Sequence, residues 1–518
     1  MEDKQMKLRN SLQIQNDIQT QEKLKDHFKE YCRYTSIHGL KYLGETKTVA
    51  ERVWWVVSIF LSICFCSFMI YQIIYKYIHY PVIITFSMKE TRLQKIPFPA
   101  VTICPRAKIS QDYLNLTDYF IRKYSGIPTT EQEKKGVSMA SQICEFYPQT
   151  QESFNVSNEE FYDFLLKSRT EIFTWCFYLG LEENCSEMFT PIITEEGICY
   201  SFNILDKHDI FNDNNEIVFE DFHTSPPLYN WNVESGYTQR EVAMYPRRAL
   251  RVGLKNALYI VLKTKKSDVE YECALDESGY RVNIDLPLNI PEVGENFISV
   301  PLNQRVIVQV TPHIIKTSDG VKNFAVSKRD CYFESERSLK FFKRYSHANC
   351  LLECKTNYTL RECGCVGINM PKEPGTPLCL LEKQKCMERA ETLFSLNNED
   401  HEVWGDVDND NTEVDCNCKP TCSDITYGTE LSYNNLILQI LNKTLREEMD
   451  FENVNYSILM LYFDKSYVET KERNELYGFS DFVSNFGGLL GLFTGFSILS
   501  CIEIIYFCSL RLWRNVYQ

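Results

Sequence analysis

The strongest constraint on the fold is an uncharged apolar run from Val53 to Ile74. Its 22 residues read VWWVVSIFLSICFCSFMIYQII, and as a helix they would extend roughly 33 Å, against a hydrocarbon core of about 30 Å. A second apolar run extends from near Phe482 to near Leu510 and contains one acidic residue, Glu503. Each run is long enough to cross a bilayer, so the sequence predicts two membrane spans with both termini on one side.

The first run is not typical of a cleaved signal peptide, because it starts far into the chain, behind a mixed-charge segment, and is too long for a signal core. We interpret it as an uncleaved anchor. Sequons for N-linked glycosylation indicate the orientation. All six lie between the two runs, at Asn115, Asn155, Asn184, Asn357, Asn442 and Asn455. The segment between the runs is therefore expected outside the cell and both termini in the cytosol.

The cysteines indicate how this outer segment is held together. Of 21 cysteines, sixteen lie in it, and the other five are Cys32, Cys64, Cys66, Cys501 and Cys508. An even set in an oxidising compartment predicts a disulfide framework. The densest part has nearly mirror-symmetric spacing, from Cys350-x3-Cys354 to Cys416-x-Cys418-x3-Cys422. The alternative is a zinc cluster, but structural zinc sites favour C-x2-C pairs of reduced thiols.

Local patterns predict an α+β outer segment. Part of residues 15–32 is expected to be helical. Residues 76–105 are expected to be extended. Short β-branched segments between 197 and 310 indicate a β core, namely CYSFNI, EIVFEDF, RRALRVGL, ALYIVLK, RVNIDL and RVIVQVTP. Helical spacing is present at 131–147, 158–169 and 334–361. The formal net charge of −15 argues against a nucleic-acid-binding surface.

Several motifs together resemble the degenerin/epithelial sodium channel family over nearly the whole chain. They are His38-Gly39 before the first run, FPAVTIC at 98–104, GICYSFN at 197–203, the cysteine cluster, CNCKPTC at 416–422 and GGLLGLFTGFSILSCIEIIY at 487–506. YPRR at 245–248 and KRDCYF at 328–333 most resemble the insect pickpocket branch.

The resemblance implies an α+β membrane protein with a β-sheet palm and ball and a helical finger and thumb. Three subunits would surround a pore. The implied domains are a cytosolic arm (1–52), a first transmembrane helix (53–75), a disulfide-rich extracellular domain (76–480), a second, pore-lining transmembrane helix (481–508) and a cytosolic tail (509–518).

The family also implies seven disulfides, namely Cys104–Cys199, Cys176–Cys185, Cys331–Cys422, Cys350–Cys418, Cys354–Cys416, Cys363–Cys386 and Cys365–Cys379. Cys144 and Cys273 are then left without family partners. We expect them to form an eighth bridge, because unpaired thiols are disfavoured outside the cell.

The second run carries the expected pore. Gly487, Gly488, Gly491 and Gly495 recur at spacings of three and four, which places small residues on one helix stripe. Such a stripe allows close helix packing, and packing alone is the alternative interpretation. Gly495-Phe496-Ser497 resembles the family's selectivity filter, where a break at Gly lets backbone carbonyls replace water around a cation. Phe496 departs from the usually small central residue.

Other residues of the expected pore follow from the resemblance. Ser484 and Asn485 match the gate positions. Glu503 is assigned to the inner pore, because a carboxylate within a span is costly; the alternative is a residue that snorkels to the interface. His38-Gly39 is assigned to gating, although an isolated His-Gly is usually a plain turn.

The resemblance thus implies a subunit of a trimeric, sodium-preferring, amiloride-sensitive cation channel in the plasma membrane. An unidentified extracellular stimulus would open it, or it would be constitutively active. Its expected partners are membrane lipid and related subunits, without nucleic acid. Sodium would be the permeant ion, and no cofactor or bound metal is expected. The alternative is a non-conducting partner subunit, or a receptor that needs a related subunit to conduct.

Two other classes of membrane protein fit the sequence less well. An ATP-gated trimeric receptor would need a cationic phosphate cluster and fewer cysteines. A membrane-tethered enzyme would need one span and a catalytic motif, and the outer segment carries no nucleophile elbow, H-E-x-x-H or P-loop.

Overall fold

The computed structural model of the chain divides into two compact units. It describes residues 21–45, 48–144, 154, 156–216, 224–228, 231–237, 245–274, 277–398, 416–436 and 449–514. The first unit contains residues 1–83, 318–329 and 474–518, and the second contains residues 84–317 and 330–473. Two of the sequons, Asn155 and Asn442, and most of the predicted strand EIVFEDF lie outside the described residues.

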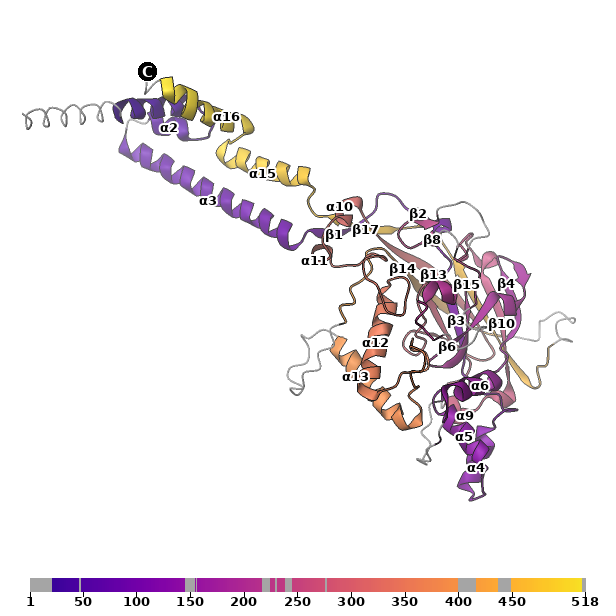
Figure 1. Cartoon of the computed structure of the whole chain (residues 1–518). Coiled ribbons are helices and arrows are strands. Elements are labelled where there is room, and N and C mark those ends of the chain that lie inside the picture. Colours follow the sequence, from indigo (N-terminus) through magenta and orange to yellow (C-terminus); the bar gives the residue numbers. More distant parts are fainter. Residues whose placement is uncertain are drawn as a thin grey trace, which may run out of the picture. The chain divides into compact units, whose positions relative to one another are not determined.

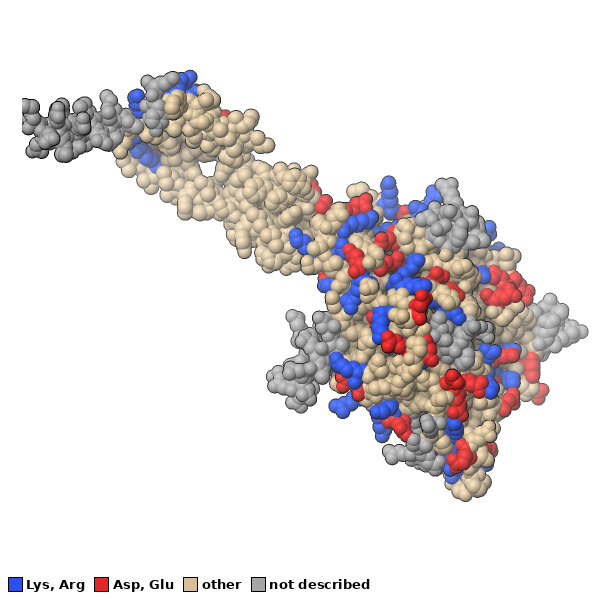
Figure 2. Space-filling view, in the orientation of Figure 1, with Lys and Arg blue, Asp and Glu red and all other residues tan. Residues whose placement is uncertain are grey.

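The first unit is helical. Residues 21–34 form a helix, and the other elements are α2 (Leu40–Glu45), α3 (Val49–His79), α10 (Asp319–Lys322), α11 (Val326–Arg329), α15 (Phe479–Thr494), α16 (Ile498–Tyr506) and the π-helical turn η5 (Phe507–Arg511). Figure 1 shows α3 and α15 side by side, and Figure 2 shows that their surface is nearly free of charged residues.

Only α3 is, by itself, long and apolar enough among the described helices to cross a membrane. A second segment qualifies if the bent pair 479–494 and 498–511, whose axes differ by 62°, is counted as one span. Helix α3 extends beyond the predicted 53–75 at both ends. Thr48 starts it by accepting a hydrogen bond from the Glu51 backbone N–H, and it ends at His79, two residues before Pro81.

The second unit contains two main sheets, except for the outer ends of β1 and β17, which fall in the first unit. One has eight strands in the order β1-β17-β13-β15-β10-β4-β5, with β14 also paired to β13. Its strands are β1 (Val82–Phe86), β4 (Phe173–Tyr178), β5 (Leu181–Glu183), β10 (Leu258–Lys265), β13 (Gln304–Thr317), β14 (Asp424–Asn435), β15 (Val454–Phe463) and β17 (Thr470–Glu475). The other is ordered β12-β11-β3-β7-β6 and contains β3 (Ala100–Pro105), β6 (Phe189–Thr194), β7 (Gly197–Phe202), β11 (Tyr280–Asp285) and β12 (Ile298–Val300).

Smaller elements complete this unit. Two-stranded ribbons pair β2 (Thr91–Arg92) with β16 (Tyr467–Val468) and β8 (Trp231–Asn232) with β9 (Gly236–Tyr237). The helices are α4 (Leu116–Tyr124), α5 (Glu131–Ala140), α6 (Asn158–Ser168), α7 (Cys185–Met188), α8 (Lys207–Ile210), α9 (Tyr271–Ala274), α12 (His347–Cys363) and α13 (Leu381–Asn398), with 3-10 turns η1 (Leu93–Lys95), η2 (Leu254–Asn256) and η3 (Lys266–Asp268).

Strand β13 organises the core of the large sheet. It pairs in parallel with β15 and β17 and antiparallel with β14. Its side chains alternate between the two faces, so that Val306, Val308 and Val310 are fully buried. The alternation explains why RVIVQVTP was predictable as a strand. The prediction of a strand at RRALRVGL was wrong: residues 247–254 make only an isolated bridge, from Arg248 to Pro97, before η2.

The helical prediction for 334–361 was wrong in its first half. Helix α12 begins at His347, where Ser346 accepts a hydrogen bond from the Asn349 backbone N–H. The apolar residues before that point, Leu339, Phe342 and Tyr345, are buried in the core all the same. Helical spacing there reflects burial of a non-helical segment.

Eight disulfides hold the second unit, and they are the pairs expected from the sequence, including Cys144–Cys273. Two of them, Cys350–Cys418 and Cys354–Cys416, join α12 to one short segment at successive turns. Zinc cannot occupy this cluster, because the sulfur atoms are bonded to each other. The five other cysteines are free.

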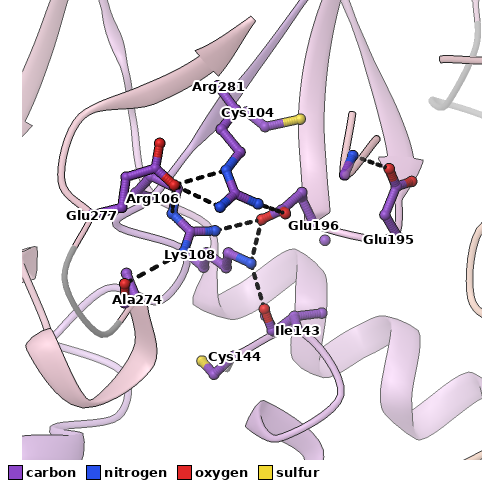
Figure 3. A network of polar contacts seen from close by, with 12 residues as sticks. Cys104, Arg106, Lys108, Ile143, Cys144, Glu195, Glu196, Ala274, Glu277 and Arg281 are labelled. Carbon is purple, nitrogen blue, oxygen red and sulfur yellow. Dashed lines mark hydrogen bonds and ion pairs between the residues drawn. The ribbon is translucent and has the colours of Figure 1, made fainter. Parts of the chain in front are cut away.

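A buried ionic network lies beside the Cys144–Cys273 bridge (Figure 3). Glu196, in the turn between β6 and β7, pairs with Arg106 at 2.8 Å, with Arg281 at 2.6 Å and with Lys108. Lys108 also donates to the carbonyl of Ile143 at 2.5 Å, and Arg106 to that of Ala274 at 3.4 Å. Since these two carbonyls adjoin Cys144 and Cys273, the network fixes the backbone on both sides of the disulfide.

Candidate ion pathway

The second apolar segment is interrupted at the residues predicted to form the filter. Helix α15 ends because Gly495 adopts a left-handed backbone conformation (φ 67°), with its N–H bonded to the Gly491 carbonyl at 3.0 Å. Ser497 then starts α16, and its hydroxyl accepts from the Ser500 backbone N–H at 3.3 Å while Ser500 Oγ accepts from the Ser497 N–H at 3.1 Å. Residues 495–497 therefore form a defined break rather than a frayed end.

The His38-Gly39 turn packs on this break. The His38 backbone N–H donates to the Thr494 carbonyl at 2.9 Å, so one of the carbonyls that a helix end leaves unpaired gains a partner. Gly39 has φ 83°, and a Cβ on it would lie 2.9 Å from Ile59 Cγ1 of α3. The turn is thus held between the first apolar helix and the break in the second.

Ser36, just before this turn, extends the contact along α16. Its hydroxyl lies 2.7 Å from Ser500 Oγ and donates to Glu503 Oε2 at 3.3 Å. The Ser36 backbone N–H also lies 3.4 Å from the same carboxylate oxygen. Glu503 is half-buried in the single chain, and Ser36 supplies two hydrogen-bond donors to its carboxylate.

The end of the second apolar segment is held by the helix at 21–34. Glu30 forms an ion pair with Arg511, and His27 Nε2 lies 3.1 Å from the Phe507 carbonyl. The Tyr31 ring meets Phe507 edge-on with centroids 5.3 Å apart. The amino-terminal arm therefore contacts the second apolar segment at both the break and the end.

Helix α15 has two opposite faces. One packs on α3: Ser62 Oγ donates to the Phe493 carbonyl at 2.8 Å, Phe65 meets the Phe493 ring at 5.4 Å, and Tyr77 meets Phe482 at 4.9 Å. The other carries Gly487, Gly488 and Gly491, and a Cβ on any of them would have no atom within 4 Å. Ser484 precedes these glycines by three, four and seven positions, so it lies on the same face.

We call the face formed by Ser484, Gly487, Gly488 and Gly491 the glycine face of α15. Ser484 and its neighbour Asn485 are both exposed in the single chain. The small-residue stripe was expected to let helices approach closely, but the helix it could meet is not α3. Within the described residues, the glycine face has no packing partner in the same chain.

Sequence reasoning missed the serines of the site. Ser36, Ser62 and Ser500 each make a hydrogen bond that fixes the second apolar segment. Ser500 could have been found, since a Ser three positions after Ser497 suits a helix N-terminus. Ser36 and Ser62 bond to residues more than 400 positions away, and no local pattern indicates them.

The fold and this site define a class of protein: a membrane channel with a large disulfide-rich mixed α/β domain. The chain belongs to the amiloride-sensitive sodium channel family, whose sequence pattern matches residues 31–507. Members of this family are ion channels rather than enzymes, and they act in the plasma membrane.

Several curated proteins are similar to most of the chain. Pickpocket protein 28 of Drosophila melanogaster is 28% identical over 516 residues, covering 96% of this chain and 80% of its own. Sodium channel protein Nach of the same species is 24% identical, covering 95% and 88%. Acid-sensing ion channel 1 of Gallus gallus is 24% identical, covering 92% and 82%. The resemblance to the insect pickpocket branch is confirmed.

Proposed function

We propose that the chain is one subunit of a trimeric, sodium-preferring, amiloride-sensitive cation channel at the cell surface. The broken segment from α15 to α16 lines the pore in this proposal. The observation that carries it is the break at Gly495, which interrupts an apolar segment and is fixed by the His38 N–H. Irregular backbone within an apolar span is tolerated where it is buried in protein or lines a water-filled path.

Gly495, Phe496 and Ser497 are the proposed selectivity filter. A sodium ion that leaves water needs oxygen ligands, and three chains could each supply backbone carbonyls and the exposed Ser497 hydroxyl at this level. The contact of His38 with Thr494 supports a stable filter geometry, because it ties the break to α3 through Gly39.

The proposed gate is Ser484 with Asn485, on or beside the glycine face. Helices in lipid associate through small residues, and this face has no partner in its own chain. Three copies that meet through it would put Ser484 near the axis. Further along the segment, Glu503 would lie at the inner pore and His38-Gly39 would control opening from the cytosolic side.

The proposed topology places both termini in the cytosol. Residues 1–52 and 509–518 would be cytosolic, 53–75 and 481–508 would span the membrane, and 76–480 would be extracellular. The eight disulfides support an oxidising location for this last part. Of the described sequons, Asn184 and Asn357 are exposed, as glycosylation requires, and Asn115 and Asn455 are partly so.

A second candidate is a silent subunit that conducts only with a related partner, or a receptor that depends on one. Phe496 favours it, since a large aromatic residue stands where the family's filter is usually small. The backbone can still serve as the filter if the ring faces a neighbouring helix. In both candidates an unidentified extracellular stimulus opens the channel, or the channel is constitutively active.

Voltage-clamp recording from cells that express the chain alone separates the candidates. If the chain forms a channel by itself, we expect an inward current that amiloride blocks. This current should disappear when sodium is replaced by N-methyl-D-glucamine. A current that appears only when a related subunit is expressed with it would favour the silent subunit. No current in either case, with the protein confirmed at the cell surface, would contradict both.

A further inference from the structure

A cavity of about 210 Å³ lies in the second unit, beside the β2–β16 ribbon. Three chain segments line it: Arg92, Leu93 and Gln94; Leu250, Arg251 and Val252; and Ser466 with Tyr467. Two other cavities of the same unit have volumes of about 10 Å³, which is room for about one water molecule. The cavity at the ribbon is therefore large enough for a small organic molecule.

The backbone holds these three segments in place. Leu93 N–H donates to the Ser466 carbonyl at 2.9 Å, and Tyr467 pairs with Arg92 across the ribbon. The segment at 250–252 is followed by Gly253, whose N–H donates to the Phe463 carbonyl at 2.8 Å. Because every wall is tied by a main-chain hydrogen bond, the cavity is a formed feature rather than a gap between loose loops.

The charge of the cavity is positive. Arg92 and Arg251 are both exposed, and neither guanidinium group has an ion-pair or hydrogen-bond partner among the described residues. The neighbouring Arg247, by contrast, forms a two-pronged pair with Glu183 at 2.8 and 3.0 Å. The carboxylate closest in sequence to Ser466, Asp464, accepts from Gln309 Nε2 at 3.2 Å. Two arginines with permanently charged guanidinium groups thus line the cavity, and neither group is paired with a described carboxylate.

The remaining walls are partly apolar. Leu93 is buried beneath the cavity, Leu250 and Val252 are half-buried, and the Tyr467 ring is 49% exposed. An inorganic anion would bind the arginines but leave these apolar surfaces exposed to water. A ligand that has both an anionic group and an apolar body would use all of them.

We propose that this cavity binds a small organic anion that carries a carboxylate or sulfonate group on an aromatic or aliphatic body. The guanidinium groups of Arg92 and Arg251 bind the anionic group, and Tyr467, Leu250 and Val252 pack against the body. The residues of the site are connected along the chain to the proposed pore helices. Arg92 follows α3 and β1 directly, and Tyr467 is followed by β17 and α15. The expected effect on current rests on the proposed function, whereas binding does not.

Photolabelling of the purified full-length protein with 4-azidobenzoate tests the binding. Mass spectrometry should find the label on peptides that contain 92–94, 250–252 or 466–467, and naphthalene-2-sulfonate should compete with it. The uncharged analogue 4-azidobenzamide should label these peptides at least ten-fold less. In the double variant Arg92→Gln/Arg251→Gln, labelling of these peptides should also fall at least ten-fold. Lys255→Gln is the matched control, since this exposed lysine lies close in sequence but does not line the cavity.

Several results would overturn the proposal. These are no label in the wild-type protein, label at other positions only, equal labelling by the amide, or unchanged labelling of the double variant. An unaltered pattern of disulfide-linked peptides shows that a variant has folded. A labelled site in a protein that carries no current would leave the binding site standing and count against the proposed channel, so the two failures are distinguishable.

Discussion

His38 lies against Gly495, although 456 positions separate them in the chain. A Cβ built on Gly495 would come within 2.6 Å of His38 Cδ2, and the backbone of His38 is fixed by its hydrogen bond to Thr494. The imidazole therefore occupies the space that any side chain at position 495 would need. The family motif before the first apolar helix and the break in the second are parts of one structure.

Gly495→Ala should reduce current at least ten-fold at equal surface expression. The substitution places a Cβ in the left-handed region, at a cost of roughly 1–2 kcal/mol, and against the His38 ring. Current density divided by surface biotinylation measures it. Gly126→Ala is the control, because Gly126 has φ 74° but no atom within 4 Å of an added Cβ. Equal effects of the two variants would mean that the contact with His38 is unimportant.

Ser484→Phe should produce a channel that stays open without a stimulus. In the proposed trimer, bulk added to the glycine face of all three copies would prevent the α15 helices from converging. Moving a gate from 1:99 to 99:1 takes about 5.5 kcal/mol, or roughly 2 kcal/mol per copy, which overpacking can supply. The holding current before stimulation measures it. Val483→Phe, at an exposed position about 100° around α15 from Ser484, is the control and should gate normally; a persistent current in this variant would argue against the assignment.

Glu196→Gln should destabilise the second unit by about 3–5 kcal/mol, because it removes the carboxylate that the buried Arg106 and Lys108 and the half-buried Arg281 share. Thermal unfolding of the purified, oxidised protein measures the loss. Glu171→Gln removes only an exposed partner of Lys263 and should change stability by less than about 1 kcal/mol. Similar melting temperatures for both variants would show that the network does not contribute.

The same carboxylate predicts a pH dependence. Burial alone would raise the pKa of Glu196, but Lys108, Arg106 and Arg281 together bring it below its ordinary value. The folded state thus binds the proton less readily than the unfolded chain. Stability from Glu196 is present above its ordinary pKa and is lost as pH falls through the lowered one. The Gln variant should lose this acid sensitivity.

Glu292 should give the stability of the fold the opposite dependence on pH. Burial, with Glu295, Glu195 and Asp285 nearby, raises its pKa from 4.5 to about 7, despite the opposing charge of Lys355. The folded state therefore takes up the proton first, and stability should fall as pH rises from about 4.5 to about 7. Glu292→Gln should remove this slope and gain roughly 1–3 kcal/mol at pH 8. Unfolding curves at pH 5, 6, 7 and 8 measure it, and a variant with an unchanged slope would contradict the assignment.

The sequence predicted those features of the fold that depend on residues close together in the chain. The alternation in β13 and the apolar run of α3 are visible in a few neighbouring residues. Seven of the disulfides could be predicted from the family pattern. The eighth, Cys144–Cys273, could be predicted because these two cysteines were left without a family partner. By contrast, residues 334–346 have helical spacing but pack without a helix.

The candidate site was predictable only in part. Gly495 and Ser497 could be selected from the sequence, because a Gly and a Ser end and start helices. Their contacts with His38 and Ser36 arise only when segments more than 450 residues apart fold together. The roles of Ser484, Asn485, Glu503 and the His38-Gly39 motif in conduction stay predictions until currents are recorded.

The glycine face of α15 has a consequence for inheritance. Since this face has no packing partner among the described residues of its own chain, a substitution there should leave a subunit that folds and joins its neighbours. If the channel is the proposed trimer, most trimers in a heterozygous animal would then contain at least one altered subunit, so such alleles should be dominant. Loss of a cysteine such as Cys350 would instead prevent the subunit from folding and joining its neighbours, so such alleles should be recessive.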